Sequence, residues 1–190
     1  MHYLYQYLFP AMWIVYLTYW WAMAGNVKED IRTESSLSRL TRSVSIILAG
    51  VLLWLPKTSI LFLDLRFLPS SIVWFWIGVI ITTIGLGFSV WARRYLGKNW
   101  SQAVTIKEDH KLISNGPYAL ARHPIYTGLL FGFVGSSIAL GEMRGVVAVV
   151  LVFLVLLHKL RLEEKWLGEQ FGESYEIYCK KVSAIIPFIF

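Results

Sequence analysis

The 190-residue chain has few charged residues and only one cysteine, Cys179. Charged residues make up 16% of the sequence and hydrophobic residues 56%, whereas about 25% are charged in ordinary globular domains. The surplus apolar surface therefore calls for lipid rather than one water-soluble core. A single cysteine excludes an intrachain disulfide. The N-terminus lacks a basic region and a small-residue cleavage site, so we expect a retained first span rather than a signal peptide.

Several kinds of functional site are also missing. His110, His123 and His158 do not have the spacing of a zinc site, so no metal is expected. No nucleophile elbow or phosphate-binding loop occurs. Glu163 and Glu164 would point roughly 100° apart on a helix and could not straddle one bond. No nucleic-acid motif is present, and the net charge of +6 is better explained by anionic lipid headgroups.

Apolar runs are abundant. A bilayer-spanning helix needs about 20 apolar residues, and we expect an all-α integral membrane protein with about five such helices in a single domain, residues 1–190. The expected spans are Leu4–Ala24, Val44–Leu55, Ser71–Trp91, Ile125–Leu140 and Val146–Leu157. Residues 1–91 hold the first three spans. Residues 92–190 hold a long polar loop (92–123), the last two spans and a charged amphipathic segment, Lys159–Lys181.

The positive charges predict the orientation. Five spans put the loops 28–42 and 92–123 and the C-terminal segment on one side, with 15 of the 18 Lys and Arg residues. The positive-inside rule makes that side cytoplasmic and puts the N-terminus outside. The membrane would be the plasma or inner membrane, or the endoplasmic reticulum, depending on the organism.

The stretch Gly116–Gly128 gathers polar and aromatic residues directly before the fourth span. Pro124 disfavours a helical His123 and suits the first position of the following helix. The first backbone N–H groups of that helix would open beside Arg122 and His123, which predicts an anion site. An interfacial belt of aromatic and basic residues is the alternative.

Two further groups have chemical potential. His110, beside Asp109 and Lys111, is either a ligand contact or a solvated turn residue. Lys159 and Glu163 are four residues apart and share a helical face. This second group is either part of a site or a snorkelling basic flank with a surface ion pair. Small residues in the third and fourth spans predict close helix contact.

An ordered set of motifs in the C-terminal half resembles the isoprenylcysteine carboxyl methyltransferase family. The motifs are His110-Lys-Leu-Ile113, Gly116-Pro-Tyr118, Arg122-His-Pro-Ile-Tyr126-x-Gly128, Glu163-Glu164, Phe171-Gly-x-x-Tyr175-x-x-Tyr178 and Ile186-Pro-Phe188. These are membrane enzymes that transfer the methyl group of S-adenosylmethionine to the carboxylate of a prenylated cysteine. The resemblance implies a cofactor pocket closed by the cytoplasmic loop and the C-terminal helix.

The resemblance also implies roles for individual residues. The implied contacts to S-adenosylmethionine are Thr105, His110, Lys111, Leu112, Ile113, Tyr118, His123, Pro124, Ile125, Tyr126 and Glu163. Lys159 stands where relatives carry an arginine that holds the acceptor carboxylate, and lysine lacks the planar bidentate fork. Either Lys159 does this, or Arg161 replaces it through a local shift, or the acceptor is not a carboxylate.

The chemistry agrees with this assignment. A carboxylate is ionised at neutral pH, so its methylation needs no general base. The enzyme must align two ligands and exclude water. The cofactor's sulfonium would suit Glu163 and the ring faces of Tyr118 or Tyr126. A lipid tail of the acceptor could enter between spans, beside the glycine-rich fourth one.

Three other functions stay open. A phospholipid amine N-methyltransferase would need a carboxylate such as Glu164 near the amine. An NADPH-dependent sterol or isoprenoid reductase could share the Arg-His-x-x-Tyr pattern, but such chains usually have more spans. A non-enzymatic membrane scaffold would tolerate the loss of His123 and Glu163.

Overall fold

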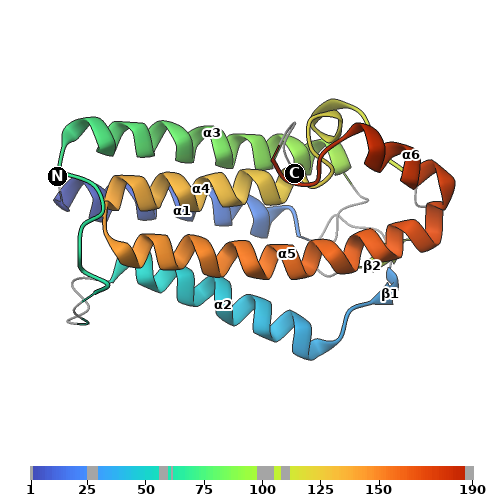
Figure 1. Cartoon of the computed structure of the whole chain (residues 1–190), viewed down its shortest axis with the longest axis horizontal. Helices are drawn as coiled ribbons and strands as arrows, with labels where there is room; N and C mark the ends of the chain where they lie inside the picture. Colours follow the sequence, from blue (N-terminus) through green and yellow to red (C-terminus); the bar gives the residue numbers. More distant parts are fainter. Residues whose placement is uncertain are drawn as a thin grey trace.

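Five long helices cross the molecule in alternating directions in the computed structural model, which describes residues 2–24, 30–55, 60, 62–97, 105–107 and 112–186 (Figure 1). They are α1 (His2–Ala22), α2 (Ser36–Trp54), α3 (Ile72–Leu96), α4 (Pro124–Leu140) and α5 (Met143–Phe171), followed by the short α6 (Glu173–Lys181). The expected all-α architecture is confirmed. The start of α2, the α3–α4 connection and α6 share one end of the bundle, as the predicted topology requires.

Two helix boundaries differ from the sequence prediction. Helix α2 begins at Ser36, within the segment expected to be a loop, because the Ser35 hydroxyl caps it by accepting the Ser38 N–H at 3.3 Å. Helix α5 continues without a break from the predicted fifth span through the charged segment to Phe171. It ends at Gly172, whose φ of 52° suits a residue without a side chain. The short helix α6 begins directly after this glycine, at Glu173.

Helices α3 and α4 are in very close contact through their small residues. A Cβ atom on Gly85 would lie 2.7 Å from the Gly128 carbonyl oxygen and 2.8 Å from the Gly132 nitrogen. The Thr82 hydroxyl also donates to the Gly132 carbonyl at 3.3 Å. The predicted close contact is confirmed. The idea that a lipid tail enters beside these glycines is wrong for this face of α4, because α3 fills it.

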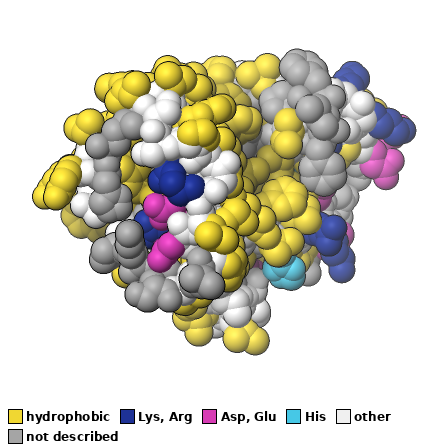
Figure 2. Space-filling view, turned by 60° about the vertical axis from the view of Figure 1, so that its left-hand side comes forward, with side chains coloured by type: hydrophobic (Ala, Val, Ile, Leu, Met, Phe, Trp, Pro, Cys, Tyr) yellow, Lys and Arg dark blue, Asp and Glu magenta, His cyan; other side chains and the backbone are white. Residues whose placement is uncertain are grey.

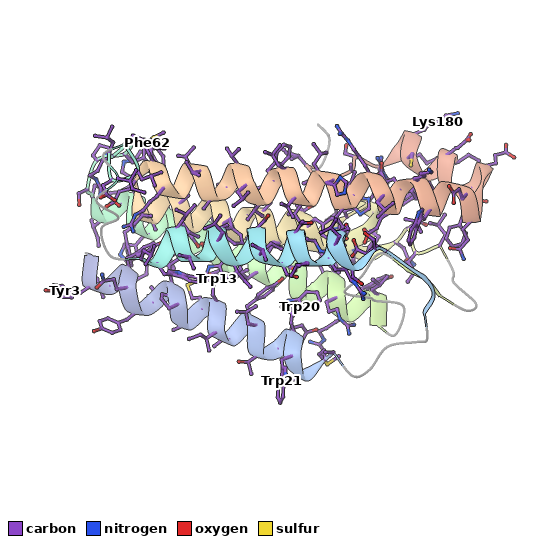
Figure 3. All side chains as sticks on the ribbon, turned by 90° about the horizontal axis from the view of Figure 1, so that it is seen from below. Tyr3, Trp13, Trp20, Trp21, Phe62 and Lys180 are labelled. Carbon is purple, nitrogen blue, oxygen red and sulfur yellow. The ribbon has the colours of Figure 1, made fainter. Side chains whose placement is uncertain are left out.

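Helix α1 attaches to this pair through aromatic side chains. The Trp13 indole donates to the Ser136 hydroxyl at 3.1 Å, and the Tyr16 and Ser89 hydroxyls are 2.8 Å apart. Figure 3 shows Trp13 pointing toward the bundle and Trp21 pointing away from it, and Trp21 is 81% exposed. One face of α1 is thus built into the protein, and the other carries exposed apolar residues that suit lipid.

The surface fits an integral membrane protein. Helices α2, α3 and α5 are long and apolar enough to cross a bilayer, and α4 is a shorter apolar helix of 17 residues. In Figure 2, charged side chains sit in the middle of the end facing the viewer, surrounded by hydrophobic side chains. At this end Arg144 is buried, pairs with Glu142 at 2.8 Å and donates to the Leu55 carbonyl. Arg66 lies 3.6 Å from the same glutamate.

A short antiparallel ladder joins the two halves of the chain at the other end. Strand β1 (Asp30–Thr33) pairs with β2 (Thr105–Lys107), so that Thr33 is opposite Thr105. Helix α2 packs against α5 directly after this ladder. The ladder adds two short strands to the expected helices, and it ties the start of α2 to the long polar loop.

Candidate functional site

The candidate site begins at the turn that leads into α4. The 3-10 helix η2 (Gly116–Ala119) precedes it, and Pro124 occupies the first turn of α4, as predicted. His123 has φ −121° and ψ 61°, outside the helical region. This turn directs the side chains of Arg122 and His123 toward Glu163 and Glu164 of α5.

Side chains from the turn before α4 and from α5 form a row of alternating charge. The Arg122 guanidinium is 2.7 Å from a Glu164 oxygen, and the same oxygen is 3.3 Å from His123 Nε2. His123 Nδ1 is 3.4 Å from Glu163, and Lys159 Nζ is 3.7 Å from the other oxygen of Glu163. Because adjacent helical residues point apart, Glu163 and Glu164 contact different nitrogens of the imidazole, Nδ1 and Nε2.

Tyr126 forms the aromatic wall of this cluster. Its ring stacks on the His123 ring, with centroids 5.3 Å apart and planes 7° apart. The Lys159 ammonium lies 5.0 Å from the Tyr126 centroid, a cation–π distance. Lys159, His123 and Tyr126 are all at most 9% exposed. The cluster is therefore a desolvated polar site at one end of an apolar bundle, which is unlike a solvated basic flank.

Arg122 also fastens the C-terminal segment to the bundle. Its guanidinium donates to the carbonyls of Cys179, at 3.2 Å, and Val182. The backbone N–H groups of Arg122 and His123 donate to the carbonyls of Ser183 and Ala184, each at 2.9 Å. These two N–H groups are thus engaged by the chain itself. Arg122 therefore has a structural role, and the anion site at the first N–H groups of α4 itself stays a prediction.

We expect Arg122→Gln to lower the free energy of unfolding by about 2–3 kcal/mol, since it leaves Glu164 and two carbonyls without their cation. The measurement is thermal unfolding in detergent, compared with Arg161→Gln on the exposed side of α5. Equal stability of the two variants would contradict this role for Arg122.

The protonation of His123 is coupled to both glutamates. Burial alone would lower its pKa, but hydrogen bonds to Glu163 and Glu164 and their charges raise it above the usual value. A histidine with a raised folded-state pKa stabilises the protein fully below its unfolded pKa of about 6.5. That contribution is lost as the pH rises through the folded-state pKa.

We therefore expect the melting-temperature difference between the wild type and His123→Gln to be largest near pH 6 and to shrink at higher pH. The groups facing the imidazole include Arg122, Glu163, Glu164 and Tyr126. The measurement is a series of melting curves for both proteins from pH 5.5 to 9. A difference that is constant across this series would contradict the coupling.

The structure brings some, but not all, of the expected residues together. Tyr118 is buried, and its carbonyl accepts the Tyr178 hydroxyl at 2.5 Å. Pro124 and Ile125 form the first turn of α4, and Leu112 and Ile113 are half-buried before η2. Thr105 takes part in the β1–β2 ladder through its backbone. Arg161 is exposed. His110 and Lys111 lie outside the described residues.

Sequence reasoning missed Glu34 and Arg42. Both are close enough to Lys159 to interact with its charge, and they pair with each other at 2.5 Å. The pair has no helical spacing, because Glu34 precedes α2 and Arg42 lies within it. It was overlooked because the segment before Val44 was taken for a loop.

The side chains of the cluster suit a sulfonium cofactor better than a metal ion. Glu163 supplies a carboxylate 3.4 Å from His123, whose ring stacks on that of Tyr126, and Tyr118 is buried on η2. Carboxylates and ring faces are what a sulfonium and an ammonium bind, so these residues fit S-adenosylmethionine. Within the described ranges, no group of three or more His, Cys, Asp or Glu residues could hold a metal ion.

Comparison with known proteins identifies related chains. A family model described as phospholipid methyltransferase matches residues 73–174. A probable protein-S-isoprenylcysteine O-methyltransferase of Oryza sativa subsp. indica is 35% identical over 121 residues, which cover 61% of this chain and 63% of the relative. The protein-S-isoprenylcysteine O-methyltransferase of Schizosaccharomyces pombe is 38% identical over 99 residues, which cover 49% of this chain and 41% of the relative.

A solved structure has a similar fold. It is a eukaryotic intramembrane Ras methyltransferase, an isoprenylcysteine carboxyl methyltransferase, with a TM-score of 0.58 and 24% identity. The match covers 84% of this chain and 55% of that chain. This chain spans less than two thirds of the length of these relatives. The family resemblance inferred from the motifs is confirmed, and Glu34 and Arg42 lie outside the range that the family model matches.

Proposed function

The chain belongs to the phospholipid methyltransferase family, and on that premise we propose that it methylates a lipid-like acceptor with S-adenosylmethionine as donor. The first acceptor to test is the carboxylate of a prenylated cysteine. The observation that carries the proposal is the buried cluster of Lys159, Glu163, His123 and Tyr126 at one end of the bundle. A cation, a carboxylate and an aromatic wall in one dry site match a cationic donor and an anionic acceptor.

Glu163 and the rings of Tyr118 and Tyr126 would hold the cofactor, which supplies an electrophilic methyl group when bound. His123 keeps Glu163 and Glu164 apart and fixes their orientation. Lys159 supplies positive charge for the acceptor carboxylate. Since this carboxylate is already ionised, no residue has to remove a proton, and the protein contributes alignment and the exclusion of water.

The test is calorimetric titration of the purified protein with S-adenosylhomocysteine and, separately, with NADPH. We expect the first to bind and the second not to bind. A radiolabelled methyl assay with a farnesylated cysteine analogue then tests the acceptor. Absence of S-adenosylhomocysteine binding would overturn the methyltransferase proposal, and binding of NADPH alone would favour a reductase.

Amine N-methylation of a phospholipid is the second candidate. The cluster includes the three carboxylates of Glu34, Glu163 and Glu164, and carboxylates suit an aminophospholipid headgroup. The same radiolabel assay with phosphatidylethanolamine vesicles distinguishes the two, because only one acceptor should incorporate the label.

The charge distribution supports a cytoplasmic site. The segments at the site's end of the bundle hold most of the basic residues, which favours the cytoplasmic side of a membrane. Cys179 lies at this end, on α6. In sealed, oriented vesicles, a membrane-impermeant thiol reagent should modify an Asn115→Cys, Cys179→Ser variant only from the cytoplasmic side. Labelling from the opposite side would contradict the orientation.

A further inference from the structure

A buried ion pair marks the start of α2. Glu34 is 4% exposed, and its two oxygens lie 2.5 and 2.8 Å from the two terminal nitrogens of Arg42. The Ser38 hydroxyl donates to the same carboxylate at 2.8 Å. Removing both charges from water costs about as much as their attraction returns. The Glu34–Arg42 pair therefore adds little to the stability of the fold. Stability alone does not explain why it is buried here.

The pair lies beside the candidate site. The β1–β2 ladder holds Thr33, the residue before Glu34, opposite Thr105 of the polar loop. Helix α2 packs against α5 (Figures 1 and 3). Glu34 and Arg42 both interact electrostatically with Lys159, and Arg42 also does so with Tyr126. Lys159 thus has Glu163 on its own helix 3.7 Å away, and the Glu34–Arg42 pair at the start of α2 is near enough for its charges to act on the ammonium.

Lys159 alone is poorly equipped to hold an acceptor carboxylate. Its ammonium is 3.7 Å from Glu163 and lies over the Tyr126 ring. A second carboxylate at this ammonium would be repelled by Glu163, since like charges at close range disfavour each other. A further cation would offset this repulsion, although Glu34 offsets part of the charge of Arg42 in the same way. A guanidinium has five N–H donors in a planar fork and can bridge two carboxylates.

We propose that Arg42, oriented by Glu34, binds the acceptor carboxylate together with Lys159. Two matched contacts with Glu34 fix the plane of the guanidinium, so that its orientation is set before the acceptor arrives. This inference rests on the proposed function and adds to it a residue from the N-terminal half of the chain. Lys159 lacks the planar bidentate group of an arginine. In this proposal Arg42 of α2 supplies that group instead.

The test compares two ligands that differ in one charge: an S-farnesylated N-acetylcysteine and its methyl ester. Their dissociation constants are measured by tryptophan fluorescence in detergent, with S-adenosylhomocysteine present. Arg42→Gln should weaken binding of the acid about 10- to 100-fold and leave the ester within about twofold. For Arg42→Lys, the dissociation constant of the acid should lie between those of the wild type and Arg42→Gln. Arg39→Gln, which removes the same charge from an exposed position of α2, should change neither.

Binding of S-adenosylhomocysteine reports whether each variant is folded. If Arg42→Gln fails to bind it, the double variant Glu34→Gln, Arg42→Gln, which leaves no buried unpaired charge, serves instead with Arg42→Lys. An unchanged ratio of acid to ester affinity in these variants would overturn the role of Arg42. A wild-type protein that binds no S-adenosylhomocysteine would instead overturn the proposed function.

Discussion

Glu163→Gln should lower kcat/KM for methylation by at least about 100-fold and weaken S-adenosylhomocysteine binding about 10- to 100-fold. The substitution keeps the shape of the side chain but removes the charge that faces His123 and Lys159. It also removes the carboxylate proposed to hold the amino group of the cofactor. Calorimetric titration gives the binding change, and the radiolabel assay gives the rate.

The matched control is Glu169→Gln, an exposed glutamate on the same helix. It should leave both quantities within about twofold of the wild type, in line with a typical surface substitution. If Glu163→Gln bound S-adenosylhomocysteine as tightly as this control, Glu163 would not be a cofactor contact, and the role of the whole cluster would have to be reassigned.

Gly128→Ala should destabilise the protein by at least about 3 kcal/mol, because its methyl group has no space. A Cβ atom there would meet the Gly85 carbonyl oxygen and would lie 2.6 Å from the Ser89 nitrogen. Both neighbours are backbone atoms of α3, so relief requires the two helices to separate. The measurement is thermal unfolding in detergent, together with the yield of monodisperse protein.

Gly87→Ala provides the comparison on α3. A Cβ atom at Gly87 would meet nothing within 4 Å, and alanine favours a helix over glycine by about 0.5–1 kcal/mol. We expect this variant to be as stable as the wild type or slightly more stable. If Gly128→Ala had the same melting temperature as Gly87→Ala, the close α3–α4 contact described above would be contradicted.

The fold was readable from the sequence where local signals and tertiary packing agree. Pro124 predicted both the non-helical His123 and the start of α4, and glycine spacing predicted the α3–α4 contact. The start of α2 was missed because hydropathy alone ignores a polar first turn. Its signal was the Ser35 cap, whose hydroxyl accepts a backbone N–H.

The site was only partly predictable, for a physical reason. Lys159 and Glu163 share a helix, so their spacing is a local property. The contacts of Arg122 with the carbonyls of Cys179 and Val182 depend on how the C-terminal segment folds back. The approach of Glu34 and Arg42 depends on the packing of α2 against α5. No pattern within a single segment predicts such contacts between distant parts of the chain.

The uninterrupted helix α5 fixes how deep in the membrane each of its residues lies. At about 1.5 Å per residue, its 29 residues extend about 43 Å, beyond the hydrocarbon thickness of about 30 Å. Arg144 anchors one end, and Lys159 follows about 22 Å further along the axis. With Arg144 at one edge of the hydrocarbon, the charged cluster thus has a fixed height about 8 Å inside the opposite edge. An acceptor whose tail stays in the bilayer would present its headgroup at that height without leaving the membrane.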